Sequence, residues 1–412
     1  MRPTKKEWYI GIEAGRQWTQ ISCYHAGTPE PETKSTLAGT ELYQIPTAIC
    51  KRKQSGQWCF GEEGRRLAEA GEGYYAADLL KRAFQKETVT LDREYAAEEL
   101  LGVFFRKLLR LALPAGGTEA VTKCVFSLEE VSQEAVAFFR QFAEKLGFTE
   151  EQVQIQDHRE SFYAYVVSQE QSLWKQQVLL FEEEGKGVYC RLFSCNRKTN
   201  PMIVEVSEAF LGKLAGDDRQ RDGEFTNMVK SVLAGRIVSA VYLIGSGFEG
   251  DWMNTSLQLI CRNRRAFQGK NLYTRGACYA GMLKVHQEDA QTVYFCDYKV
   301  RQNIMLRAVK GDVEFFYPVV EAGSNRHQID KKLRILLEGE PVLEIWVQEP
   351  KNKEARIESL ELTGLVLMEQ ERSRLSLHFF CGNDGKIFLK VQDLGWGSMH
   401  PGRGQEWSFE LL

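Results

Sequence analysis

The side chains that most often carry chemistry are scattered through this chain of 412 residues. Its cysteines form no C-x-x-C pair and have no histidine at metal-ligand spacing. The six histidines show no paired spacing, and no order of serine, histidine and aspartate indicates nucleophilic catalysis. We therefore expect reduced cysteines in the core, with a disulfide or metal framework as the alternative. The ten are Cys23, Cys50, Cys59, Cys124, Cys190, Cys195, Cys261, Cys278, Cys296 and Cys381.

Two short runs of like charge stand out. Glu182 to Glu184 precede Gly185, and the simplest interpretation is an exposed hairpin tip between two strands. The dense basic cluster CRNRRAF holds Arg262, Arg264 and Arg265, which could meet an acidic partner. We favour a solvated helix end for that cluster.

The composition limits the kinds of partner. Apolar residues make up 43% of the chain and charged residues 26%, with a net charge of −3. The apolar fraction is sufficient for two or three cores, whereas no positive field exists to hold nucleic acid or anionic lipid. The N-terminus has no apolar segment of a leader, and no run approaches the ~18 apolar residues of a spanning helix. We expect a cytoplasmic protein, neither secreted nor inserted in a membrane.

The first two thirds of the chain alternate strands with helices. A hairpin is predicted over Trp8 to Tyr24, with Gly15 in its turn, and an amphipathic helix over Tyr95 to Leu113. Ser127 and Glu130 fit a capping box for the next helix. The order of elements indicates a layered α/β domain. Further strands are predicted at 43–50, 120–127, 152–156, 178–181, 187–193 and 239–244, helices at 158–169, 225–233, 252–261 and 272–285, and a solvated loop at 216–224.

In the last third of the chain, after a polar break at 286–292, the spacing of apolar residues changes to one typical of strands. Short strands follow one another, and Asn383, Asp384 and Gly385 supply the turn of a hairpin. We expect a compact β-sandwich. Its predicted strands are 303–309, 313–317, 332–338, 342–348, 358–363, 375–381 and 387–393.

The order of these segments resembles the heat-shock-seventy (DnaK-type) chaperone family across nearly the whole chain. The segments are IGIEAGRQWTQIS, ADLLKRAF, the connecting region VTKCVFSLEE to SFYAYV, FEEEGKGVY, YLIGSGFEGDWM with LYTRGACYAGML, and the C-terminal hairpin LSLHFFCGNDGKIFLKVQD. The resemblance implies an α/β actin-like domain, of the duplicated RNase H-like kind, over 1–286 with a reduced helical subdomain. A substrate-binding β-sandwich over 293–412, without the helical lid, would follow it.

The resemblance also implies the residues of a Mg-ATP or Mg-ADP site. Degenerate catalytic counterparts are Glu13 at the first phosphate loop, Lys81 as the phosphate-contacting lysine, Asp157 at the catalytic acid and Glu182 at the second phosphate loop. The nucleotide-contacting positions would be Gly15, Gly185, Gly187, Gly245, Ser246, Gly247 and Gly276.

Several of these positions depart from the family pattern. Arg16 and Gln17 replace a hydroxyl pair, His158 replaces a proline, and Glu182 to Glu184 replace a glycine loop. Two like charges at ~4 Å repel by about 4 kcal/mol at an effective dielectric near 20, so these acids oppose a polyphosphate. We expect no efficient ATP hydrolysis. Glu13, Asp157 and Glu182 could still hold a divalent cation beside Lys81, although we favour hydrated remnants around an empty cleft.

The function expected from the resemblance is that of a chaperone-like protein-binding or scaffold protein with a non-hydrolysing cleft. Its partner would be a protein or peptide, held in a groove of the sandwich. The candidate lining residues are Phe315, Phe316, Val319 and Val320, with ordinary sandwich core as the alternative for these four. One alternative is an active ATP-dependent chaperone that binds Mg-ATP and unfolded peptide. Another is a structural subunit of a larger assembly.

Overall fold

The chain divides into two compact units. In the computed structural model, residues 2–37, 39–286, 291–311, 313–350, 355–365, 372–382, 384–395 and 404–411 are described. The first unit comprises Met1–Cys195 and Glu205–Ala290, and the second comprises Asn196–Val204 and Gln291–Leu412. The sequence did not predict that 196–204 would group with the later segment. The Met202 N–H donates to the Gln291 carbonyl at 2.9 Å, which ties these two parts of the second unit together.

The first sheet of the first unit begins with the predicted hairpin, which is confirmed. β1 and β2 pair antiparallel, and β10 and β11 extend the sheet in parallel with β1. Its spatial order is β11 (Val153–Asp157), β10 (Lys123–Leu128), β1 (Trp8–Ala14), β2 (Trp18–His25) and β3 (Glu32–Thr33), with β4 (Ile45–Pro46) also on β2. Nearly every side chain of β1 and β2 is buried, which explains the dense apolar run in the sequence.

Helices and small sheets complete this lobe. The predicted amphipathic helix is confirmed as α3 (Ala97–Leu109), whose Phe104 and Phe105 are fully buried with Phe126, Phe139 and Phe142. Their rings meet edge to face or tilted, which adds to the burial. The remaining elements are α1 (Gly61–Glu69), α2 (Leu79–Phe84), α4 (Gln133–Lys145), the sheet of β6 (Trp58–Phe60), β5 (Ile49–Arg52) and β7 (Gly73–Ala76), and the hairpin of β8 (Thr88–Thr90) and β9 (Glu94–Ala96).

The predicted capping box at Ser127 and Glu130 is wrong. Ser127 lies inside β10, fully buried, and its hydroxyl is 2.6 Å from that of Ser161. The helix α4 begins later and is capped by Ser132, which accepts the Ala135 N–H at 3.1 Å. A buried hydroxyl needs a partner, and Ser127 finds it on a neighbouring helix rather than at a cap.

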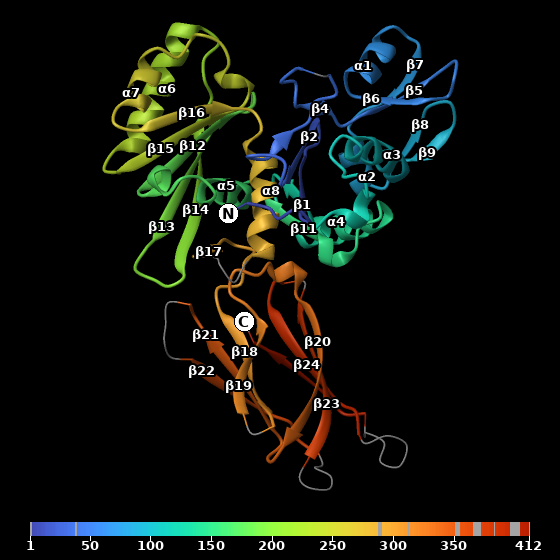
Figure 1. The fold of residues 1–412 in the computed structure, drawn as a ribbon, viewed down its shortest axis with the longest axis vertical. Helices are drawn as coiled ribbons and strands as arrows, with labels where there is room; N and C mark the ends of the chain where they lie inside the picture. The colour runs from blue at the N-terminus through green and yellow to red at the C-terminus, as the bar shows by residue number, and fades with distance from the viewer. Residues whose placement is uncertain are drawn as a thin grey trace. The chain divides into compact units, whose positions relative to one another are not determined.

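The second sheet of the first unit carries the predicted strands of the second lobe. β12 pairs antiparallel with β13 and parallel with β15. Its order is β16 (Arg265–Gly269), β15 (Val238–Ile244), β12 (Gln177–Glu183), β13 (Val188–Asn196), β14 (Met202–Gly212) and β17 (Thr292–Phe295). The helices α6 (Asp218–Leu233) and α7 (Thr255–Cys261) accompany it, and Figure 1 shows them in yellow-green beside these strands.

The prediction of a solvated loop over 216–224 is wrong, because α6 begins at Asp218. Asp222 is only 7% exposed, and its carboxylate accepts the N–H groups of Thr255 and Ser256 at 2.7 and 3.0 Å. It therefore caps α7 from a neighbouring helix, and a tertiary contact makes an aspartate favourable inside α6. β14 was also missing from the prediction.

Two central helices, α5 (His158–Val167) and α8 (Leu272–Val285), join the lobes of the first unit (Figure 1). They cross closely at Gly276, where an added Cβ would lie closer than 3.0 Å to the Ser161 carbonyl oxygen. On its other side, α8 packs on β1 at Gly11. An added Cβ at Gly11 would lie closer than 3.0 Å to the Thr274 carbonyl oxygen. Glycine at these points lets the backbones touch.

The second unit contains two four-stranded antiparallel sheets around one core, and the predicted strands are confirmed. Val319 and Val320 belong to that core, whereas Phe315 and Phe316 are 40% and 48% exposed. The turn residue Asn383 lies outside the described residues, while Gly385 has a φ of +79°. One sheet is β19 (Val313–Val320), β18 (Asn303–Lys310), β21 (Val342–Gln348) and β22 (Arg356–Glu361), and the other is β20 (Asp330–Glu338), β23 (Arg372–Cys381), β24 (Ile387–Asp393) and β25 (Glu406–Glu410). The short strand β17 (Thr292–Phe295) precedes them.

The cysteines are free thiols, most of them buried, although Cys261 is exposed rather than part of a core. In the described ranges, no helix is long and apolar enough to cross a membrane.

Candidate functional site

A buried cluster of charged and aromatic side chains lies where the two lobes of the first unit meet α8. Arg191 on β13 is 7% exposed, and its guanidinium pairs with Glu182 of β12 and donates to the Tyr273 hydroxyl. Tyr273, on α8, donates in turn to Glu182 at 2.8 Å. Glu208 of β14 lies 2.6 Å from the other side of the guanidinium. The cluster thus joins three strands of the second lobe to the central helix.

The charges of this cluster support one another. Burial disfavours the ionised form of Glu182, but Arg191 and His158 hold the pKa of this carboxyl below its usual range. Burial also opposes the charge of Arg191, yet Tyr273, Glu182 and Glu208 raise its pKa above the ordinary value. Burial raises the pKa of Tyr273 well above its usual value. At neutral pH the cluster is therefore a carboxylate and a guanidinium bridged by a neutral phenol.

Glu13 and His158 extend the cluster toward the first lobe. The His158 ring stacks on Tyr273 with centroids 4.1 Å apart, and its Nε2 lies 3.6 Å from the Glu13 carboxyl. Burial, with repulsion from Glu182 and Glu184, raises the pKa of Glu13 to about 8. Burial lowers the pKa of His158 to about 4. Both groups are therefore mainly neutral at pH 7, and their separation is too long for a hydrogen bond.

The wild-type protein is expected to lose stability as the pH rises from 6.5 to 8, and replacing Glu13 with glutamine should remove that loss. A carboxyl whose folded pKa is raised stabilises the fold fully below its unfolded pKa and loses that contribution as the pH rises through 8. The lowered pKa of His158 acts in the opposite direction, but only below about pH 6.5. Between pH 6.5 and 8, the free energy of unfolding should therefore fall by about 2 kcal/mol in the wild type.

Urea unfolding at pH 6.5 and pH 8 measures this difference for the wild type and for Glu13→Gln. Glu130→Gln, at an exposed position, is the matched control and should retain the wild-type difference. An equal pH dependence in all three proteins would show that Glu13 is ionised at neutral pH.

Asp157 does not join the cluster but caps the helix that follows it. It is 2% exposed, and its carboxylate accepts the Glu160 N–H and the Arg159 side chain, each at 2.7 Å. These contacts satisfy the acceptor oxygens locally. Asp157 therefore caps α5 in this structure, and its role beside a metal or an attacking water stays a prediction.

Lys81 and Gly15 also lie apart from the cluster. Lys81 is exposed on α2, and within the described ranges no hydrogen bond or ion pair joins it to Glu13, Asp157 or Glu182. Gly15 occupies a tight turn, where an added Cβ would lie closer than 3.0 Å to the Trp18 carbonyl oxygen. The structure therefore does not bring the predicted phosphate-contacting residues together.

The prediction of an exposed glutamate tip is wrong for two of its three residues. Glu182 pairs with Arg191, and Glu183 is only 7% exposed because its side chain packs against Gly247. Only Glu184 is exposed, and it accepts the Ser246 hydroxyl at 3.2 Å. A sequence pattern of three acids could not show that one of them has a buried guanidinium opposite it.

The glycines predicted to contact a nucleotide serve packing instead. An added Cβ at Gly245, which has a φ of +103°, would overlap the Glu183 backbone, and one at Gly247 would overlap its carboxylate. Gly187, with a φ of +113°, lies against Gly212, and Gly276 lies against α5. Only Gly185 has open space around it. Most of these glycines are therefore required by close contacts within this chain.

Residues 30–297 match the model described as "Family of unknown function (DUF5716) C-terminal". The chain belongs to this family. Residues 299–412 match a second model, described as "Domain of unknown function (DUF8552)". No curated protein matches the sequence. The junction between the two matched regions lies within a few residues of the point where the second compact unit resumes at Gln291.

The residues of this DUF5716 chain do not fit a magnesium nucleotide. The carboxylate of Glu182 is already paired with Arg191, and that of Asp157 caps a helix. No group of three or more His, Cys, Asp or Glu side chains in the described part of the chain is placed to hold a metal. In nucleotide sites Mg²⁺ is usually held by one or two carboxylates together with waters and phosphates, and here the carboxylates of Glu182 and Asp157 are engaged by this chain's own groups. Arg191 was the functional residue that the sequence reasoning missed.

Proposed function

We propose that this chain is a chaperone-like protein-binding scaffold whose actin-like first unit neither holds nor hydrolyses nucleotide, and whose β-sandwich unit binds extended protein segments. The observation that carries the proposal is the buried Arg191 cluster, which uses the acid expected at the second phosphate loop as an internal ion-pair partner. A carboxylate so engaged is not available to a metal, and Gly245 and Gly247 near it pack against Glu183.

The proposal of a rigid scaffold rests on contacts between the lobes of the first unit. The Gln20 side chain donates to the Lys270 carbonyl at 2.9 Å, and the Asn271 side chain donates to Thr33 at 2.7 Å. The Arg191 cluster adds a buried link through α8, which packs on β1. In proteins whose lobes close on a ligand, that ligand supplies the energy of closure. In this chain, the hydrogen bonds and ion pairs between the lobes would hold them together without a ligand.

The proposal of protein binding rests on the edge strand β19. Within the described part of the second unit it ends one sheet, so its outer backbone groups face no neighbouring strand there. Val313 is 66% exposed and Phe315 is 40% exposed, and Val309 on the adjoining strand is 62% exposed. An edge with apolar side chains can accept an extended segment by main-chain hydrogen bonds and side-chain contacts. We call Val313 and Phe315 the edge patch; Val309 pairs with Glu314 and so points to the opposite face of the sheet.

Peptide binding tests this proposal. A labelled peptide with leucine at alternate positions is expected to bind the full chain, as measured by fluorescence anisotropy. Val313→Lys should weaken binding by about tenfold, because a buried valine contributes about 1.5 kcal/mol. Ile237→Lys, at a position in the first unit that is 73% exposed, should bind as the wild type does. Absence of binding at about 100 µM, or equal weakening by both variants, would refute peptide binding at this edge.

A further inference from the structure

The first sheet of the second unit carries apolar side chains on the face turned away from its core. Pro318, Met305, Trp346 and Ile357 stand in register across its four strands. Their neighbours along β18 and β21 are core residues, and successive side chains of a strand point to opposite faces. We call these four the outer row. It crosses three gaps between strands and so spans about 14 Å.

The outer row is accessible. Ile357 is 46% exposed, and Phe316, on the same face, is 48% exposed with its ring centroid 4.7 Å from that of Trp346. Aromatic and aliphatic side chains gathered on an exposed face commonly mark a protein contact. The outer row differs from the edge patch, since it lies on a sheet face rather than at a strand edge.

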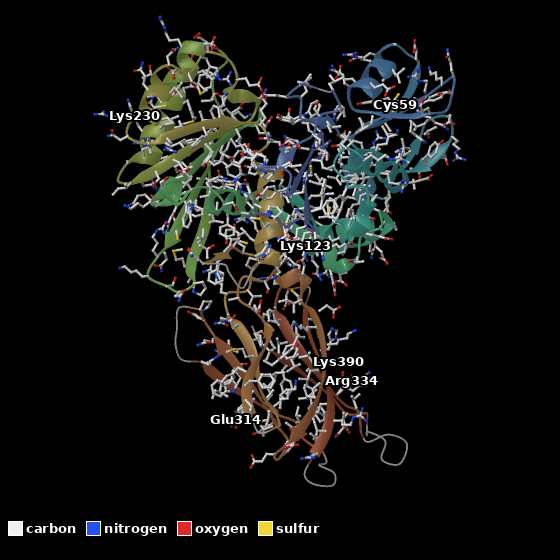
Figure 2. The ribbon with its side chains drawn as sticks, viewed as in Figure 1. Cys59, Lys123, Lys230, Glu314, Arg334 and Lys390 are labelled. Carbon is white, nitrogen blue, oxygen red and sulfur yellow. The ribbon has the colours of Figure 1, made fainter. Side chains whose placement is uncertain are left out.

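The two sides of the outer row, along the strand direction, differ in charge. Among the described residues toward the tip of the β18–β19 hairpin, the same face carries Glu314, Glu344 and Glu361 but only one cation, Arg307. Arg307 already pairs with Glu314 at 2.6 Å, and Figure 2 labels Glu314 on this sheet. On the other side of the row, the register continues through a neutral asparagine and glutamine pair. The apolar row therefore has one acidic flank.

From this face we infer that the outer row docks an amphipathic helix of a partner protein, with its apolar stripe on the row and basic side chains toward Glu344 and Glu361. The backbone groups of the inner strands are engaged in the sheet, so an added strand cannot pair there, whereas a helix can cover a sheet face. A second copy of this chain carries a net charge of −3, which disfavours it as the occupant beside an acidic flank. Helix docking does not depend on peptide binding at the edge patch.

Binding of a model peptide tests the inference. The probe is a labelled leucine–lysine peptide whose leucines follow helical spacing, titrated into the full chain. Phe316→Ser and Glu344→Lys should each weaken binding by about tenfold. The matched controls on the other sheet, Phe388→Ser and Glu338→Lys, should leave it unchanged. A peptide with glutamate in place of lysine should bind at least about tenfold more weakly than the probe. Circular dichroism confirms that each variant is folded.

Four outcomes would overturn the inference. One is no binding of the helical probe at about 100 µM. Another is that Phe316→Ser weakens binding of a peptide in which leucine and lysine alternate as much as it weakens binding of the helical probe, since the alternating pattern forms a strand. A third is equal loss in the control variants. The last is a wild-type dimer that Phe316→Ser converts to monomer in sedimentation, because the occupant would then be a second copy.

Discussion

Replacing Arg191 with alanine is expected to destabilise the first unit by about 3 to 5 kcal/mol. The substitution leaves Glu182 buried and without its guanidinium, and it leaves Tyr273 with one partner fewer. Glu208 is 34% exposed and can regain water, so the larger part of the loss should come from Glu182. Urea unfolding followed by tryptophan fluorescence measures the change.

The control for this substitution is Arg16→Ala. Arg16 pairs with Asp78 at 3.4 Å but is 60% exposed, so its removal should cost less than about 1 kcal/mol. The double variant Arg191→Met with Glu182→Gln removes both buried charges and should recover more than half of the loss, because a neutral buried pair needs no counter-ion. Equal small effects of Arg191→Ala and Arg16→Ala would contradict the buried ion-pair account.

Replacing Gly276 with alanine is expected to destabilise the first unit by about 3 kcal/mol or more. The new methyl group would lie closer than 3.0 Å to the Ser161 carbonyl oxygen, which is rigid backbone of α5. Relief therefore requires the two central helices to separate, and α8 also packs on β1. Thermal or urea unfolding of the purified variant gives the difference.

The same substitution at Gly223 provides a control of opposite sign. Gly223 lies inside α6, and an added Cβ there would meet no atom within 4 Å. Alanine is the better helix former, so Gly223→Ala should stabilise the chain by about 0.5 to 1 kcal/mol. If Gly276→Ala were neutral, the close crossing of α5 and α8 would be wrong.

The spacing of apolar residues, together with residues typical of turns, predicted most of the helices and strands. The strands of the second unit alternate buried and exposed residues, as in β21 and β23, and their positions were predicted closely. The stretch at 216–224 was misjudged because its acids and glycines suggest a loop. Asp222 is helical there only because it caps another helix 33 residues away.

The candidate site was much less predictable. Its members come from six elements, and Arg191 and Tyr273 are 82 residues apart in sequence. One signal was present: Arg191 stands among apolar residues in the strand YCRLF, and a buried arginine requires a carboxylate partner. The identity of that partner depended on the pairing of β12 with β13, which places Glu182 opposite Tyr189 and thus near Arg191.

The resemblance to the heat-shock-seventy family remains a prediction for the fold and function. Three of the glycines on which it relied, Gly245, Gly247 and Gly276, do lie at close approaches, but the approaching groups belong to Glu183 and Ser161. A motif of glycines indicates that something comes near the backbone, and it does not say what comes near.

Isothermal titration calorimetry of the full chain with ATP, in the presence and absence of magnesium, tests the central claim most directly. The claim is that Arg191 and Glu183 occupy the space and satisfy the charges that a nucleotide would need. We expect no saturable heat at millimolar ATP and no rise in the melting temperature, whereas a ligand at about 100 times its dissociation constant would add about 2.7 kcal/mol. Saturable binding that requires magnesium would contradict the account.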